Sequence, residues 1–233
     1  MISKADWEEV PGTIDSDSDE KLFFSVHEWD TIDAAASRII PTDADPGAHE
    51  AGVIVFIDRY LSGIEFNFAT AAGGGFLQMA GKDAVAARAR NANMQRLYRG
   101  GVKELDRIAG ELGQQSFKSA SADVQDQVLE QLSGSPKPAP ISLDSREVFH
   151  SRLQGNTDDG MPFFPTLCLH VRQGFYADPV YGGNKGQVGW RVIGFPGPKC
   201  LRDTMDGTYS TAEYFVQEYD WSELIPGFKA SGG

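Results

Sequence analysis

One stretch toward the C-terminal end carries polar side chains that are able to do chemistry. It reads Ala177-Asp178-Pro179-Val180-Tyr181-Gly182-Gly183-Asn184 and places a carboxylate, a phenol and an amide close together in the chain. Acid–base catalysis by Asp178 requires a reactive partner, and the sequence fixes no histidine, lysine or second carboxylate beside it. An enzyme or small-molecule binder with a pocket around Asp178, Tyr181 and Asn184 is therefore the weaker of two interpretations.

The stronger interpretation is that these residues shape a turn. An aspartate before a proline accepts hydrogen bonds from the backbone N–H groups that follow it, which suits Asp178. Asn184 can do the same from a left-handed conformation, and Gly182 and Gly183 tolerate positive φ. We expect structural roles for Asp178, Gly182, Gly183 and Asn184.

Elsewhere the chain lacks the common catalytic and nucleotide-binding motifs. The four histidines belong to no metal-binding pattern, and we expect surface or packing roles for His27, His49, His150 and His170. The glycines at 73–75 have no strand before them and no Lys-Ser or Lys-Thr pair after them, so they do not predict a phosphate site. We expect no catalytic residue, no bound cofactor and no metal in this chain.

The two cysteines form no Cys-x-x-Cys motif, which excludes the usual zinc, iron–sulfur and haem-attachment patterns. In an oxidising compartment, Cys168 and Cys200 could form a disulfide with each other or with another subunit. Two buried thiols that act as small hydrophobic residues are the equally weighted alternative.

Hydrophobic residues at helical spacing predict a mainly α fold. Ser25 and Glu28 form a capping box that begins the first helix, Asp45 is expected to cap the second, and Gly100-Gly101 is expected to kink the third. The segment 63–81 reads as a flexible loop. The expected helices span residues 25–40, 46–62, 83–112, 121–132, 145–154 and 164–175.

These helices predict a single helical domain over residues 22–208 that ends in a long irregular region of glycine, proline and aromatic residues. Residues 1–21 are acidic and poor in apolar side chains, so we expect a mobile or draped arm. Residues 209–233 form an aromatic C-terminal extension, which needs a surface of its own domain or of a partner to lie on.

The run GFYADPVYGGNKGQVGWRVIGFPG, residues 174–197, resembles the C-terminal signature of the gluconate 2-dehydrogenase subunit 3 family. The residues around Arg38-Ile39-Ile40-Pro41 and Ala51-Gly52-Val53 resemble the N-terminal half of the same family. The resemblance therefore covers both ends of the expected helical domain. Members of this family are small accessory subunits of bacterial, FAD-dependent sugar and polyol dehydrogenases.

The resemblance implies a non-catalytic subunit that binds, stabilises and helps to mature or export a flavoprotein large subunit of the glucose-methanol-choline oxidoreductase type. The FAD belongs to that partner, and electrons often leave through a multihaem cytochrome c subunit. Large rings typically anchor such interfaces, and we nominate Tyr181, Trp190, Phe195 and Trp221. Direct electron transfer by this chain is a third and weaker hypothesis.

A formal net charge of -12 argues against binding to nucleic acid and to anionic membranes. No apolar run is long enough to span a bilayer. The resemblance implies a periplasmic complex, whereas the N-terminal residues show neither an apolar export signal nor the twin-arginine pair of many relatives, which keeps a cytoplasmic location open.

Overall fold

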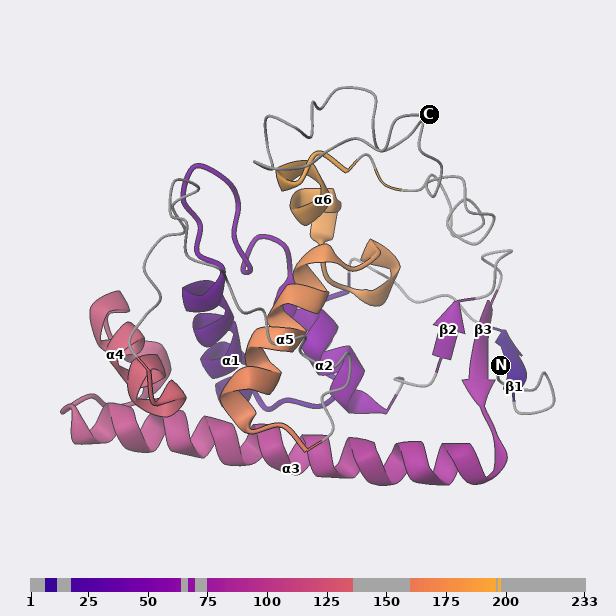
Figure 1. The fold of residues 1–233 in the computed structure, drawn as a ribbon, viewed down its shortest axis with the longest axis horizontal. Coiled ribbons are helices and arrows are strands. Elements are labelled where there is room, and N and C mark those ends of the chain that lie inside the picture. Colours follow the sequence, from indigo (N-terminus) through magenta and orange to yellow (C-terminus); the bar gives the residue numbers. More distant parts are fainter. Residues whose placement is uncertain are drawn as a thin grey trace, which may run out of the picture.

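The computed structural model describes residues 7–11, 18–63, 67–69, 75–135, 160–195 and 197, and the fold of this part is mainly α, as predicted. In Figure 1, α1, α2 and α5 lie together across the long helix α3, with α4 near one end of α3 and the small sheet near the other. The α-helices are α1 (Val26–Ile39), α2 (Val53–Ser62), α3 (Gly81–Glu111), α4 (Ala122–Ser133), α5 (Phe163–Tyr176) and α6 (Val188–Val192). Short 3-10 helices are η2 (Phe117–Ser119), η3 (Pro179–Tyr181) and η4 (Lys185–Gln187).

Helix α1 begins with the predicted capping box. The Ser25 hydroxyl accepts the Glu28 backbone N–H at 3.3 Å, and the Glu28 carboxylate accepts the Ser25 N–H at 2.9 Å. The buried face of α1 contains Ile32, Ala35 and Ala36, and the two small alanines let neighbouring helices approach closely.

Helix α2 begins later than predicted. The expected cap Asp45 and the residues after it form turns, and the helix starts at Val53 after Gly52 adopts a left-handed conformation with φ of 65°. A left-handed residue interrupts an α-helix. The helix therefore does not include the residues before Gly52, although the apolar pattern continues through them. Val53, Ile57 and Leu61 are fully buried in the core.

Asp58 on the same helix fixes the chain that leads into α1. Its carboxylate is fully buried and accepts the backbone N–H groups of Leu22 at 2.6 Å, Phe23 at 3.1 Å and Phe24 at 2.8 Å. These three backbone N–H groups stabilise the buried carboxylate, and the same bonds hold the chain so that the Phe24 ring lies in the core.

Helix α3 runs through Gly100-Gly101 without the predicted kink (Figure 1). Gly101 instead makes room for a ring, because a Cβ at this position would clash with Phe163 at the start of α5. Tyr98, one turn earlier, is hydrogen-bonded to Nδ1 of the fully buried His170 at 2.8 Å and stacks on its ring. His170 is thus a packing residue of the core, within the roles expected for the histidines.

A small antiparallel sheet replaces part of the predicted loop at 63–81. Strand β3 (Gly75–Met79) pairs with β2 (Asn67–Ala69) on one side and with β1 (Trp7–Pro11) on the other. The sequence analysis missed the sheet because its strands are short and one of them comes from the N-terminal segment, where local periodicity gives no signal. Residues 145–154 and 209–233, for which we predicted a helix and an aromatic extension, lie outside the described residues.

Candidate functional site

The residues that carry the sequence signature form a compact reversal of the chain after α5. We call residues 177–195 together with Gly197 the C-terminal corner; it contains η3, η4 and α6 and lies beyond the end of α5 (Figure 1). Two residues other than glycine adopt positive φ within the described part, Asn184 at 50° and Gln187 at 60°, and both belong to this corner. Such conformations persist where surrounding contacts hold them in place.

The corner opens with Asp178, whose carboxylate accepts the Val180 N–H at 3.0 Å and caps η3. Pro179 occupies the first position of that short helix, and Gly182 ends it with φ of 99°. The left-handed conformation of Gly182 favours glycine, and a Cβ there would also lie close to the Arg59 side chain.

Gly183 and Gly189 let the corner pack directly against the backbone of α5. A Cβ on Gly183 would overlap the carbonyl oxygen of Gly174, and one on Gly189 would overlap that of Phe175. Gly183 has no positive φ, so its role is close approach and not backbone freedom. The backbone of the corner therefore rests on α5 at Gly183 and Gly189 with no side chain of its own between them.

Asn184 joins the two ends of the corner from a fully buried position. Its Nδ2 donates to the carbonyl oxygen of Ala177 at 2.9 Å, and its Oδ1 accepts the Gly189 N–H at 2.8 Å. Both polar atoms of the amide are thus hydrogen-bonded to the backbone, and the side chain holds the two ends of the corner together.

The corner also binds the N-terminal half of the chain. The Lys185 N–H donates to the carbonyl oxygen of Ala51 at 2.8 Å. The adjacent Gly52, which begins α2, would place a Cβ 3.6 Å from both the Gly182 carbonyl oxygen and the Lys185 Cβ. The two segments that carried the family resemblance therefore meet in space.

Trp190, nominated as a ring displayed to a partner, instead turns inward. It is only 6% exposed, and its indole N–H donates to the Tyr176 carbonyl oxygen at 2.8 Å. Its ring packs edge-on against Phe195 at 5.3 Å between centroids, and a Cβ on Gly197 would clash with it. The indole is held by its own chain, since a buried Trp N–H requires a polar partner.

The other nominated anchors have mixed positions. Tyr181 and Phe195 are partly buried in the corner, and Trp221 lies outside the described residues. Three apolar side chains that the sequence analysis did not single out are exposed around Trp190: Tyr176 at 41%, Val192 at 41% and Ile193 at 58%. We call Tyr176, Val192 and Ile193 the apolar rim. The Tyr176 carbonyl accepts the Trp190 indole N–H, and Val192 and Ile193 follow Trp190 in the chain. The sequence alone does not show that these side chains are exposed while Trp190 is buried.

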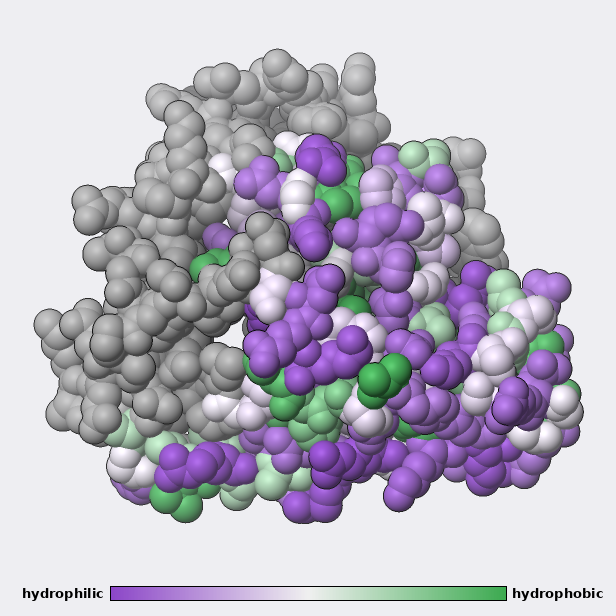
Figure 2. Space-filling view, turned by 180° about the vertical axis from the view of Figure 1, so that it is seen from behind, coloured by the Kyte–Doolittle hydropathy of each residue, from purple (hydrophilic) through white to green (hydrophobic). Residues whose placement is uncertain are grey.

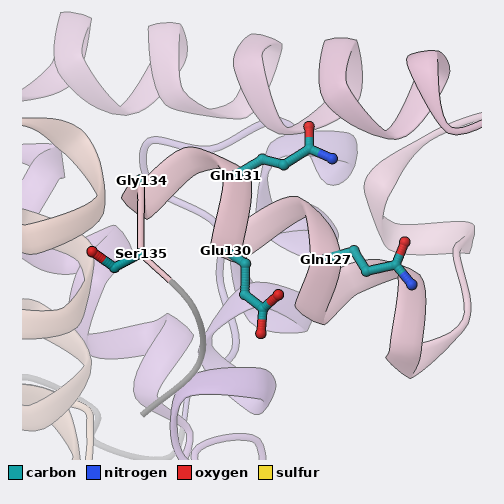
Figure 3. Close-up of a pocket in the computed structure, with 5 residues that line it drawn as sticks. All are labelled: Gln127, Glu130, Gln131, Gly134 and Ser135. Carbon is teal, nitrogen blue, oxygen red and sulfur yellow. The ribbon is translucent and has the colours of Figure 1, made fainter.

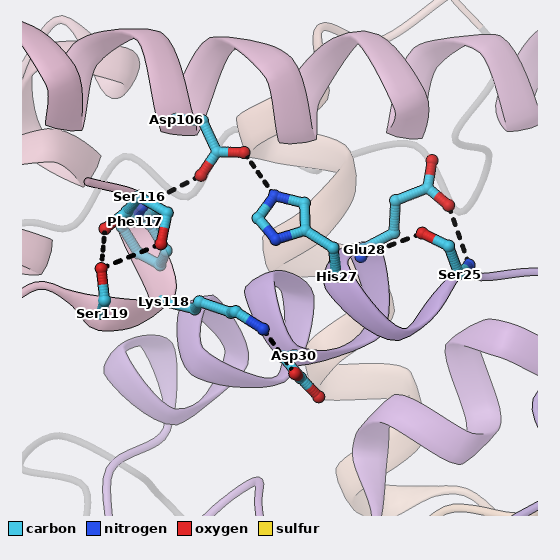
Figure 4. Close-up of polar contacts among 9 residues, drawn as sticks. All are labelled: Ser25, His27, Glu28, Asp30, Asp106, Ser116, Phe117, Lys118 and Ser119. Atoms are coloured by element: carbon cyan, nitrogen blue, oxygen red, sulfur yellow. Dashed lines mark hydrogen bonds and ion pairs between the residues drawn. The ribbon is translucent and has the colours of Figure 1, made fainter.

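A histidine–aspartate pair next to serines lies between α1, α3 and η2 (Figure 4). The Asp106 carboxylate accepts from Nε2 of His27 at 2.6 Å and from the Phe117 N–H at 3.0 Å. The hydroxyls of Ser116 and Ser119 bind each other at 2.9 Å and not the imidazole. The cluster therefore fastens three elements and lacks the nucleophile-to-base bond of a catalytic triad.

Cys168 lies on α5, mostly covered, and burial raises the pKa of its thiol to about 11, which the nearby Arg172 guanidinium only partly offsets. A thiol of this kind is protonated near neutral pH and is a poor nucleophile. Cys200 lies outside the described residues, so a disulfide between Cys168 and Cys200 stays a prediction.

A surface depression of about 430 Å³ lies beside the end of α4 (Figure 3). Its lining contains amides, one carboxylate and a hydroxyl, and consists of Gln127, Glu130, Gln131, Gly134 and Ser135. Within the described residues there is no group of three or more His, Cys, Asp or Glu side chains that could hold a metal. The depression is thus an open hollow at the surface, bordered by polar residues of α4 and the two residues that follow it.

Comparison with known proteins concerns the same residues that build the helices and the corner. The sequence profile of the family Gluconate 2-dehydrogenase subunit 3 matches residues 26–197. The chain belongs to this family. The gluconate 2-dehydrogenase subunit 3 match starts at the first residue of α1 and ends at Gly197, the last described residue of the corner. No curated protein and no solved structure was found to match the chain.

Members of the gluconate 2-dehydrogenase subunit 3 family are, by the family's description, one subunit of a dehydrogenase complex. The glycines and the buried asparagine of the signature are the residues that give the corner its shape and its close packing on α5. None of the helices in the described ranges is long and apolar enough to cross a membrane.

Proposed function

We propose that this chain is a non-catalytic accessory subunit that binds and stabilises the FAD-containing catalytic subunit of a sugar or sugar-acid dehydrogenase. Family membership supports a role as one subunit of such a complex. In this proposal the FAD and the hydride chemistry reside in a partner of the glucose-methanol-choline oxidoreductase type. A multihaem cytochrome c subunit accepts the electrons, and the assembly works in the periplasm.

The chemistry of the corner favours this proposal over an independent enzyme or small-molecule binder. The Asp178 carboxylate caps a helix, and the Asn184 amide makes one hydrogen bond through Nδ2 and one through Oδ1, both to backbone groups. Of the three residues in the alternative pocket, these two are therefore committed to holding the loop. A ligand there would have to compete with hydrogen bonds that fold the corner.

The apolar rim is the observation that carries the proposal. Tyr176 at the end of α5 and Val192 and Ile193 in the corner expose large side chains. The backbone there is held by Asn184, by the Trp190 indole and by the close packing of Gly183 and Gly189 on α5. Rigid presentation lowers the entropy lost on association, and apolar anchors of this kind supply most of the binding free energy at protein interfaces. The rim is thus suited to dock against another subunit.

Co-expression tests the proposed function. The candidate flavoprotein is produced with and without this chain, and its soluble yield, flavin absorbance and dehydrogenase turnover are compared. We expect yield and FAD content to fall several-fold without the accessory chain, with flavin-normalised turnover preserved. Equal yield, equal FAD loading and equal turnover in both cultures, with no complex on size exclusion, would refute it.

Ligand binding tests the alternative independently. Calorimetric titration of the isolated chain with gluconate, glucose and fructose is expected to show no heat of binding. Binding that Asp178→Ala abolishes while the thermal midpoint is retained would favour the alternative, because it would assign the carboxylate to a ligand rather than to the helix cap.

A further inference from the structure

Helix α3 carries a concentration of positive charge that the rest of the chain lacks. Residues 84–103 contain Arg88, Arg90, Arg96, Arg99 and Lys103 and no aspartate or glutamate, in a chain of formal net charge -12. Cations so segregated are not needed to keep an acidic protein soluble. Their grouping on one helix therefore calls for a binding explanation.

Four of these cations share the solvent side of α3. At 3.6 residues per turn, Arg88, Arg96, Arg99 and Lys103 fall within an arc of roughly 80° and extend over roughly 22 Å of helix. All four are exposed, while Met94, Tyr98 and Leu105 on the opposite side enter the core. We call Arg88, Arg96, Arg99 and Lys103 the basic stripe.

Apolar surface interrupts the charges of the stripe. Val85 is 60% exposed, and Ala89 beside it is exposed as well. Figure 2 shows this mixture along the lower edge of the molecule, where hydrophilic residues of α3 alternate with paler and hydrophobic ones. Arginine is enriched at protein–protein interfaces relative to the rest of the surface.

Contacts within the described part of the chain leave the stripe largely unneutralised. Arg96 donates to the neutral amide of Asn93, and Arg99 lies 3.8 Å from the Glu28 carboxylate and over the Phe23 ring. No ion pair to Arg88 or Lys103 occurs among the described residues.

The next turn of the same helix behaves differently. Arg107 is bound by Glu104 and by Glu111, which keeps its pKa raised above the ordinary value. Neutralisation by neighbouring carboxylates thus starts where the stripe ends. The contrast shows that α3 can pair a cation with carboxylates of its own helix, as it does at Arg107.

We propose that the basic stripe docks on an acidic protein surface of the partner subunit, as a second contact in addition to the apolar rim. This inference rests on the proposed function, because it takes the occupant to be a protein subunit. Charge complementarity supports it: exposed guanidinium and ammonium groups that are largely unneutralised within the described part of the chain are suited to bind surface carboxylates. The net charge of -12 opposes binding to nucleic acid and to anionic lipid, because these polyanions are repelled by the acidic protein as a whole.

The test compares two triple substitutions that lower the net charge by the same amount. Arg88→Gln/Arg96→Gln/Lys103→Gln removes the stripe, and Ala122→Glu/Gln127→Glu/Gln131→Glu adds carboxylates on exposed positions of α4. Each purified variant is titrated against the immobilised FAD-loaded catalytic subunit at several NaCl concentrations. Thermal unfolding checks that both variants keep the wild-type fold.

We expect the stripe variant to bind about tenfold more weakly at low salt, mainly through slower association, and to lose most of the salt dependence that the wild type shows. The α4 variant is expected to stay within about twofold of the wild type. Equal affinities for all three chains would overturn the inference while leaving the proposed function intact. A wild-type chain that fails to bind the flavoprotein would instead refute the proposed function, and the inference with it.

Parallel titrations against phosphatidylglycerol vesicles and duplex DNA identify the other classes of occupant. No retention is expected on either. Retention of the wild type that the stripe variant loses would overturn the assignment of a protein partner.

Discussion

The indole N–H of Trp190 donates to the carbonyl oxygen of Tyr176, so the two aromatic residues face opposite ways: the tryptophan is buried and the tyrosine ring is exposed. This bond joins the end of α5 to α6. Val192 and Ile193 follow the buried Trp190 closely in the sequence.

Asn184→Ala should destabilise the fold strongly. It removes both hydrogen bonds of the amide and leaves the Ala177 carbonyl and the Gly189 N–H without their partner. Alanine also tolerates the left-handed φ of 50° less well than asparagine. We expect a loss of about 3 kcal/mol in the free energy of unfolding, measured by urea denaturation. The surface variant Asn93→Ala should change it by less than about 0.5 kcal/mol; similar values for both would contradict the role of Asn184.

Gly183→Ala should cost about 2–3 kcal/mol, because its methyl group would overlap the backbone of α5. Gly110→Ala is the matched control, since a Cβ at this position on α3 would meet no atom within 4 Å. That control should stabilise the protein by about 0.5–1 kcal/mol through helix propensity. Thermal and urea unfolding of both variants give opposite signs if close approach is the reason for Gly183, and the same sign otherwise.

Ile193→Asp should weaken binding to the flavoprotein by about tenfold or more while leaving the unfolding midpoint unchanged, because an exposed side chain of the apolar rim contributes little to the core. Surface plasmon resonance with the immobilised flavoprotein measures the change. Val26→Asp is the control: Val26 is 65% exposed and begins α1, where an acidic residue suits the helix terminus. Equal loss with both variants would point to a general charge effect and not to the rim.

Cys168 should make stability fall at high pH. The buried thiol keeps its proton up to a pKa of about 11, whereas in the unfolded chain it loses the proton near its ordinary value of 9.0. Between these values the folded state binds more protons, so the free energy of unfolding decreases as pH rises.

The measurement compares Cys168→Ala with its parent in a Cys200→Ala background at pH 8, 9, 10 and 11. The stability difference between parent and variant should shrink by about 2 kcal/mol across pH 9 to 11. Alkylation of Cys168 by iodoacetamide should be slow at neutral pH and rise through the same range. Rapid alkylation at pH 7 would show that the thiol is neither buried nor protonated.

Sequence reasoning predicted the features that depend on neighbouring residues. The Ser25 and Glu28 capping box and the helices near α1, α3, α4 and α5 follow from periodicity and local hydrogen bonding. The predicted start of α2 at residue 46 was wrong, because Gly52 adopts a left-handed conformation that no periodic pattern reveals.

Features that depend on distant residues were not predictable. The sheet needs β1 from the N-terminal segment to pair with β3, and the buried Asp58 looks like a surface carboxylate until the chain at 22–24 folds back over it. Trp190 is the clearest case in the candidate site. A tryptophan in a loop suits an interface anchor and a core residue equally well, and only its bond to Tyr176 decides between them.

The hydrogen bond from Lys185 to Ala51 has a consequence for how the chain matures. Contacts between residues so far apart in sequence form late and slow folding, because a long loop must close first. During synthesis α1 to α4 emerge from the ribosome before the corner exists, and the surface of α5 that receives Gly183 and Gly189 stays uncovered until then. A chain that ends before residue 183 therefore lacks both the backbone that packs on α5 and the bond that joins the corner to the N-terminal half.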